Sequence, residues 1–301
     1  HDAVIESVDV STIYEVPLLM QKEKLDKIVL KKLDLSHNTE VKLKKWEKFL
    51  NELKKPKQET TIGLVGKYVE LQDAYKSISE AIIHAGAKNS CKVDVVWIHA
   101  EKINKENAAE KLAGLKGIIV APGFGDRGIE GKISAIKHIR ENNIPFLGIC
   151  LGMQSAVIEY SRNVLGLKDA NSTEMNPKTS APVINLMHEQ KDITDKGGTM
   201  RLGAYECHLE KESNAYNAYK KNKISERHRH RFEFNNKYKN DLENAGLITT
   251  GFNKKNKLVE VVEIPKHPWF VGVQFHPEFK STVDNPHPLF CGFIQACINN
   301  K

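Results

Sequence analysis

Residues 146–160, FLGICLGMQSAVIEY, place one cysteine between two glycines at the point where an apolar strand gives way to a helix. A direct turn from a parallel strand into a helix strains the backbone at the bend, and Gly148 and Gly152 would relieve the crowding around Cys150. The bend would lift the Cys150 sulfur to the carboxyl edge of the sheet, where open α/β folds bind ligands. The partial positive charge of a helix N-terminus favours the thiolate there. The stretch therefore predicts a reactive cysteine in an α/β fold.

The sequence around this stretch alternates between strand and helix patterns. TTIGLVGKYV (60–69), KVDVVWIHA (92–100) and IPFLGIC (144–150) predict buried strands, and residues 108–125 contain a helix, a strand and a glycine-rich loop. Helices are predicted at 73–86 and 129–143. This order predicts an α/β fold with a doubly wound, mostly parallel sheet from about Thr60 to Tyr160.

Two further regions flank this sheet. Near the C-terminus, KLVEVVEIP (257–265) and WFVGVQFH (269–276) predict successive strands, which form an additional antiparallel region before a helix near 289–298. On the N-terminal side, apolar residues at helical spacing predict a helix from Leu25 to Leu53, followed by the linker KKPKQET. We therefore divide the chain into residues 1–57 and a main domain of residues 58–301.

Composition limits the class of protein. The chain is 40% hydrophobic and 28% charged, and it contains no apolar run long enough for a membrane span. Its net charge of +7 is spread among acidic residues, which favours a solvated surface over a nucleic-acid site. The number of cysteines is odd, and their spacing fits neither a disulfide framework nor a metal site, so we expect a cytoplasmic protein. We expect the four cysteines other than Cys150 to be inert small hydrophobes.

A thiolate that attacks a carbonyl needs a base, and the base needs a carboxylate to orient it. GVQFHPEF offers both, because His276 ends a predicted strand and Glu278 lies two positions further on. VAPGFGDRG (120–128) follows another strand and should lie at the same sheet edge. Its backbone amides, together with that of Leu151, could face a developing oxyanion, a contribution worth about 3 to 4 kcal/mol.

RHRHR (227–231) has several interpretations. On a strand, Arg227, Arg229 and Arg231 would share one face and the two histidines the other. Taken alone, the pattern fits an exposed basic strand, a small-anion site, or a metal or nucleic-acid site. No further ligands at metal spacing follow it, and we predict no metal in this chain.

The motifs GICLGMQ, NSTEM, GGTMRLG, ERHRHRFEFN and GVQFHPEF together resemble the glutaminase domain of the CTP synthase family. The resemblance runs from about Thr60 to the C-terminus and implies the flavodoxin-like glutamine amidotransferase fold. DAVIESVDVSTIYEVPLL (2–19) resembles the end of the family's preceding synthetase domain. The chain starts at His1 within that pattern, so we expect upstream sequence to have been left out.

The resemblance also assigns roles to residues. It implies Cys150 as the nucleophile, His276 as the general base and acid, and Glu278 as the carboxylate that orients the histidine. Glutamine would be held by the following residues: Gly123, Leu151, Gly152, Met153, Gln154, Glu174 and Arg231. A carboxylate and a cation complement the α-ammonium and α-carboxylate of glutamine, which makes RHRHR part of a substrate clamp.

One position departs from the family pattern. Where the family commonly reads Pro-Gly-Gly-Phe-Gly, the ungapped alignment places Pro122 at the second position. Proline has no amide hydrogen, so Pro122 cannot donate to an oxyanion. We expect the loop to shift by one residue so that Gly123 and Leu151 form the oxyanion hole; a weaker hole is the alternative.

The family makes CTP from UTP with ATP, using ammonia released from glutamine through a thioester. Its ATP, magnesium and UTP sites lie in the synthetase domain, whose P-loop has no counterpart here, so we expect no cofactor in this chain. GTP activation and a homotetramer are also implied. Two alternatives remain: a PfpI-like cysteine hydrolase, which would not require the HPE motif, and a catalytically degenerate amidotransferase domain that serves as a scaffold or regulatory module.

Overall fold

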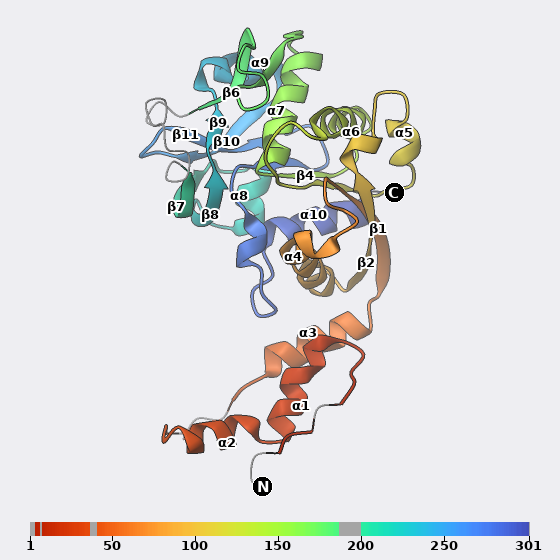
Figure 1. Cartoon of the computed structure of the whole chain (residues 1–301), viewed down its shortest axis with the longest axis vertical. Coiled ribbons are helices and arrows are strands. Elements are labelled where there is room, and N and C mark those ends of the chain that lie inside the picture. Colours follow the sequence, from red (N-terminus) through yellow and green to blue (C-terminus); the bar gives the residue numbers. More distant parts are fainter. Residues whose placement is uncertain (1–3, 7, 37–40, 187–199, 301) are drawn as a thin grey trace.

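A computed structural model describes residues 4–6, 8–36, 41–186 and 200–300 of the chain (Figure 1). Its centre is a nine-stranded sheet with the order β2-β1-β3-β4-β12-β11-β10-β7-β8. The first five strands are parallel, and each later strand runs antiparallel to its neighbour. The predicted doubly wound α/β sheet with an added antiparallel region is confirmed.

The strands of this sheet are β1 (Gln58–Gly66), β2 (Cys91–His99), β3 (Ile118–Val120), β4 (Phe146–Ile149), β7 (Arg201–Leu209), β8 (Lys223–His230), β10 (Ile248–Asn253), β11 (Leu258–Glu263) and β12 (Phe270–Val273). A small second sheet contains β5 (Ala170–Ser172), β6 (Ala181–Leu186) and β9 (Phe232–Phe234). The central strands β3, β4 and β12 are buried along their whole length, which explains why they are continuous apolar runs.

Helices cover both faces of the parallel half. On one face lie α6 (Ile129–Glu141) and α7 (Leu151–Asn163), and on the other lie α4 (Lys76–Lys88) and α10 (Pro288–Asn299) (Figure 1). Each face has its own apolar core: Ile133 and Ile136 belong to the first, and Ile82 and Phe293 to the second. Shorter helices are α5 (Ala108–Lys111), α8 (Asn214–Tyr219) and α9 (Lys239–Ala245).

The N-terminal region differs from the prediction of one helix over residues 25–53. It forms α1 (Val16–Lys22), α2 (Leu25–Lys32) and α3 (Lys44–Lys54). The first part of the predicted helix ends because Asp34 adopts a left-handed conformation with φ 51°, and the Leu35 amide donates back to the Leu30 carbonyl. This is a C-terminal stop that helical spacing alone does not reveal.

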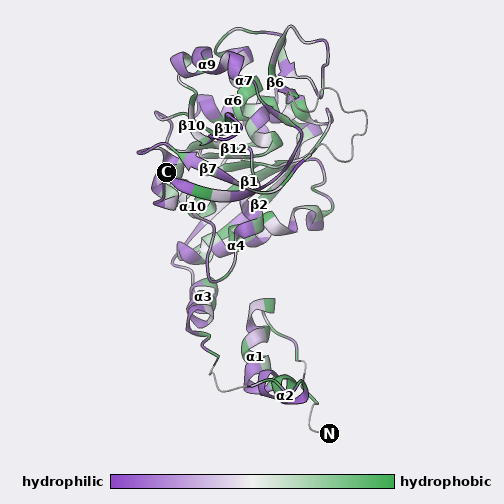
Figure 2. Ribbon diagram, turned by 90° about the vertical axis from the view of Figure 1, so that its left-hand side faces the viewer, coloured by the Kyte–Doolittle hydropathy of each residue, from purple (hydrophilic) through white to green (hydrophobic). Residues whose placement is uncertain are grey.

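Of these helices, α3 packs on the sheet domain, while α1 and α2 project away from it (Figure 2). Phe49 and Leu50 of α3 form a small core with Tyr14 and Ala87. The Tyr14 hydroxyl lies 3.1 Å from Nε2 of His84 on α4. Only residues 55–57 separate α3 from β1, so the predicted linker is short. None of the helices within the described residues is both long and apolar enough to span a bilayer.

Candidate active site

Cys150 occupies the bend between β4 and α7, with φ 51° and ψ −102°, a region that side chains rarely adopt. The flanking glycines are required by close packing. A Cβ on Gly152 would lie 2.2 Å from the Val120 carbonyl oxygen, and a Cβ on Gly148 would lie 2.8 Å from the Gly152 carbonyl carbon. The helix therefore begins in direct contact with the neighbouring strands, and the strained residue is held at its N-terminus.

His276 reaches the same place from β12, the parallel neighbour of β4. Val273 pairs with Ile149, and the Cys150 amide donates to the Val273 carbonyl at 2.7 Å. Beyond the strand, the His276 amide donates to the Arg227 carbonyl at 2.8 Å. These backbone contacts fix the histidine and the cysteine at one edge of the sheet.

Glu278 orients the imidazole of His276. Its Oε1 lies 2.7 Å from His276 Nδ1, and both side chains are buried. The carboxylate accepts from Nδ1, so Nε2 is the nitrogen left to exchange protons. Nε2 is buried and makes no hydrogen bond of standard geometry within the described residues.

The charge state of His276 follows from its neighbours. Burial alone would lower its pKa, but interactions with the Cys150 thiolate and the Glu278 carboxylate outweigh burial and raise the pKa to about 10. The ring is therefore protonated at neutral pH when the cysteine is a thiolate, which is the ion pair that an activated cysteine requires.

Two glutamines complete the surroundings of the sulfur. Gln274 Nε2 donates to Cys150 Sγ at 3.6 Å. The side chain of Gln154, which is predicted to contact glutamine, donates to Gln274 Oε1 at 3.1 Å and to the Phe232 carbonyl at 2.9 Å. The side chain of Gln154 thus contacts Gln274, the residue that contacts the sulfur.

The loop after β3 lies opposite the start of α7. A Cβ on Gly123 would lie 3.5 Å from Leu151 Cδ2. Within the described part of the chain, the backbone amides of Gly123 and Leu151 have no hydrogen-bond acceptor, as expected for donors at a helix start and an open loop. The Gly125 amide is already engaged, because it donates to Glu174 Oε1 at 2.7 Å. Gly123 and Leu151 therefore remain the candidate oxyanion donors.

A cavity of about 340 Å³ opens over these groups. The groups named above that line it are Gly123, Cys150, His276 and Glu278, and they are joined by Tyr68, Pro122, Phe124, Arg229 and Phe279. Phe279 stacks on the His276 ring with centroids 5.2 Å apart. The volume suits a ligand of amino-acid size.

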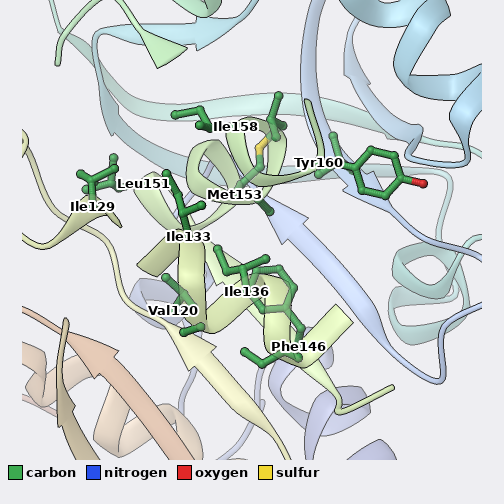
Figure 3. Close-up of a cluster of buried hydrophobic side chains, with 14 of the residues drawn as sticks. Val120, Ile129, Ile133, Ile136, Phe146, Leu151, Met153, Ile158 and Tyr160 are labelled. Carbon is green, nitrogen blue, oxygen red and sulfur yellow. The ribbon is translucent and has the colours of Figure 1, made fainter. Parts of the chain in front are cut away.

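Other predicted ligands do not line this cavity. Leu151 and Met153 point into the core with Ile133 and Ile136 (Figure 3), so only their backbone could meet a substrate. Gly152 is buried against Val120. Glu174 is bound to the loop, and Arg231 lies partly buried just after β8.

RHRHR alternates as predicted, with Arg227 and Arg229 exposed and His228 and His230 buried. Of these residues, only Arg229 lines the cavity. Within the described residues, no group of three histidine, cysteine or acidic side chains is placed to hold a metal ion. The metal interpretation of this motif therefore gains no support.

The buried histidines belong to a charge cluster behind the sheet edge. Arg201 Nη2 lies 2.7 Å from Glu260 Oε1, and Arg201 Nη1 lies 3.4 Å from Glu233 Oε1. His228 Nδ1 lies 2.9 Å from His230 Nε2. Burial raises the pKa of Glu260 to about 7 and lowers that of His230 to about 3. This cluster joins parts of GGTMRLG and RHRHRFE into one structural unit; residues 197–199 of the first motif lie outside the described residues.

Sequence reasoning missed two lysines at the loop. Lys132 is fully buried, and its Nζ donates to the Ala121 carbonyl at 2.7 Å. Lys67 donates to the Phe124 carbonyl. The available signal was a lysine on the apolar face of α6, three positions after Ile129 and one before Ile133.

Known proteins are similar to this chain in sequence and in fold. A family model described as glutamine amidotransferase class-I matches residues 70–296. The chain is 62% identical over 298 residues to a CTP synthase of Flavobacterium johnsoniae and 56% identical over 300 residues to that of Clostridium acetobutylicum. These alignments cover 99% and 100% of the chain but only 56% of each relative. The chain thus spans about half the length of the curated relatives it matches.

A solved structure agrees with these matches. The Trypanosoma brucei CTPS glutaminase domain with bound acivicin superposes with a TM-score of 0.76 and is 38% identical. The match covers 80% of this chain and 95% of that domain. The family match, the fold and the cysteine bend agree, and the chain belongs to the class-I glutamine amidotransferase family.

Proposed function

We propose that this chain hydrolyses L-glutamine to glutamate and ammonia as the glutaminase part of a CTP synthase. The observation that carries the proposal is the convergence of Cys150, His276 and Glu278 on one cavity. The similarity to CTP synthases and to an acivicin-bound glutaminase domain supports the choice of glutamine among amide substrates.

In the first half of the reaction, the Cys150 thiolate attacks the carboxamide carbon of glutamine. The negative charge on the carbonyl oxygen would be stabilised by the amides of Gly123 and Leu151. The tetrahedral intermediate collapses as His276 gives its proton to the leaving nitrogen, so that ammonia departs and a thioester remains.

In the second half, His276 takes a proton from water as the water attacks the thioester. The same two amides would stabilise the second oxyanion. Collapse of this intermediate breaks the carbon–sulfur bond, releases glutamate and returns the cysteine to its starting state. Glu278 keeps Nε2 facing the reaction through both halves and transfers no proton itself.

Substrate recognition would use groups around the cavity. We assign the glutamine α-ammonium to Glu174 and the α-carboxylate to Arg231, with further contacts from Gly123 and from residues 151–154. Charge complementarity supports the first two assignments. The bond between Glu174 and the Gly125 amide holds this carboxylate beside the loop that lines the cavity with Cys150.

The larger reaction would need the part of the relatives that this chain does not match. We propose that ammonia passes to a synthetase domain, where ATP and magnesium support the amination of UTP to CTP, with GTP as activator. Residues 1–57 would be the end of that domain and the connection to it, and residues 58–301 the glutaminase domain. The relation to CTP synthases also supports a cytoplasmic homotetramer that binds neither nucleic acid nor membrane.

A glutaminase assay tests the first step directly. The wild-type chain should release glutamate from glutamine, and Cys150→Ala should abolish this activity. Cys207→Ala is the matched control, because Cys207 is buried without a glycine-framed bend, and it should retain nearly full activity. A glutamine-mimicking electrophile should label Cys150 alone, as read by mass spectrometry. Glutamine binding without turnover would instead support the degenerate scaffold.

A further inference from the structure

Lys132 is a charged side chain in an apolar position. It is buried on α6 with Ile129, Ile133 and Ile136, which belong to the same apolar core as Leu151 of α7 and Phe146 of β4 (Figure 3). Its exposed fraction is 0%. A buried ammonium is costly, and an apolar side chain of similar length would fill the same space without that cost. The lysine must therefore be explained by what its amino group contacts.

That contact is the loop between β3 and α6. Lys132 Nζ donates to the Ala121 carbonyl at 2.7 Å, directly before Pro122 and Gly123. At the other end of the same segment, Lys67 Nζ donates to the Phe124 carbonyl. The two lysines thus hold the carbonyls on either side of the Pro122–Gly123 pair, which has no regular secondary structure to fix it.

The electrostatics link Lys132 to the nucleophile. Burial and the nearby Lys67 lower the pKa of Lys132 to about 7, while the Cys150 thiolate acts in the opposite direction. The Ala121 carbonyl that Lys132 holds begins the loop whose Gly123 lines the cavity together with Cys150. In either protonation state the amino group of Lys132 keeps an N–H for the Ala121 carbonyl.

We propose that Lys132 is a positioning residue for the oxyanion loop, and that with Lys67 it fixes the peptide that presents the Gly123 amide to the reacting oxygen. This inference rests on the proposed glutaminase function. Lys132 would stabilise the transition state through the position of the Gly123 amide, and it would not contact the substrate. The two lysine side chains would hold the backbone of this loop in place, as backbone hydrogen bonds of the helix hold the start of α7.

Lys132→Met tests the proposal, because methionine keeps the length and apolar packing but cannot donate. A loop displaced by a fraction of an ångström should lower kcat for glutamine by about tenfold to a hundredfold, with KM changed less than about threefold. Alkylation of Cys150 by iodoacetamide forms no oxyanion, so its rate should fall far less than kcat. Lys137→Met is the matched control on α6. Lys137 is partly exposed, and its Nζ lies 4.0 Å from Glu141 Oε1, so this variant should behave as wild type.

Lys67→Met provides the second variant if Lys132→Met fails to fold, and it should show the same separation between kcat and alkylation. Unchanged kcat in a folded Lys132→Met protein would overturn the inference while the glutaminase function stands. A parallel fall in kcat and alkylation would also overturn it, because the lysine would then act on the thiol. A wild-type chain that released no glutamate would reject the proposed function itself, and the inference with it.

Discussion

Gly152→Ala is the substitution for which the structure gives the clearest expectation. The new Cβ would lie 2.2 Å from the Val120 carbonyl oxygen and 3.1 Å from the Val120 carbonyl carbon. Carbon–oxygen contacts are normally roughly 3.3 Å or longer, so the first turn of α7 must move away from β3 by about 1 Å. Backbone atoms on both sides leave no flexible group to give way.

This displacement would carry the Leu151 amide and the Cys150 sulfur away from the loop of Gly123. A misplacement of about 1 Å can cost roughly a hundredfold in rate, and overpacking a core costs about 1–3 kcal/mol. We therefore expect kcat/KM for glutamine to fall by about a hundredfold, while the free energy of unfolding in urea falls by only about 1–3 kcal/mol.

Ser161→Ala is the control for Gly152→Ala. Ser161 is buried on the same helix, and its hydroxyl donates only to the Val157 carbonyl one turn earlier, at 2.7 Å. Its removal should leave kcat/KM unchanged and alter stability by less than about 1 kcal/mol. Gly152→Ala activity within threefold of wild type would show that the bend tolerates a side chain, and the packing argument for the glycine would be wrong.

Three other predictions concern the catalytic groups. Glu278→Gln should lower glutaminase kcat less than His276→Ala, because the amide can still hold the ring; equal losses in steady-state assays would contradict this division of roles. Pro122→Gly should not increase glutamine turnover if Gly123 already donates, and a clear rise would show that Pro122 faces the oxyanion. The raised pKa of His276 stabilises the folded state fully below the unfolded value of about 6.5, and this contribution is lost as pH rises through about 10. The stability advantage of wild type over His276→Ala in urea unfolding should therefore shrink between pH 7 and 10, and a gap that widened there would refute the assigned charge state.

The sequence predicted the parallel half of the fold well. Strands such as β4 and β12 are buried on both faces, so their apolar runs stand out, and the glycines around Cys150 mark a bend that few other sequences require. The antiparallel half was less visible, because several buried positions of β7 and β8 carry polar or charged residues, among them Arg201, Glu226 and His228. Helical spacing over residues 25–53 could not reveal the left-handed stop at Asp34.

In the candidate site, contacts between residues close in sequence were predictable, and contacts between distant residues were not. The contact between His276 and Glu278 follows from two positions of local sequence, and the structure places their atoms 2.7 Å apart. The pairing of Gln154 with Gln274 joins residues that are distant in sequence, so no local pattern announces it. Lys132 escaped notice because lysine normally marks an exposed helix face, and only the loop beside it explains its burial.

The strand order has a consequence for how the protein is made. β12 lies between β4 and β11 in the sheet, yet it follows β4 only after most of the domain has been synthesised. Cys150 therefore leaves the ribosome well before His276 and Gln274, and it lacks its base until β12 inserts. Under the proposed glutaminase function, a nascent chain would not consume glutamine in this period, and ammonia production would start only once the central sheet is complete.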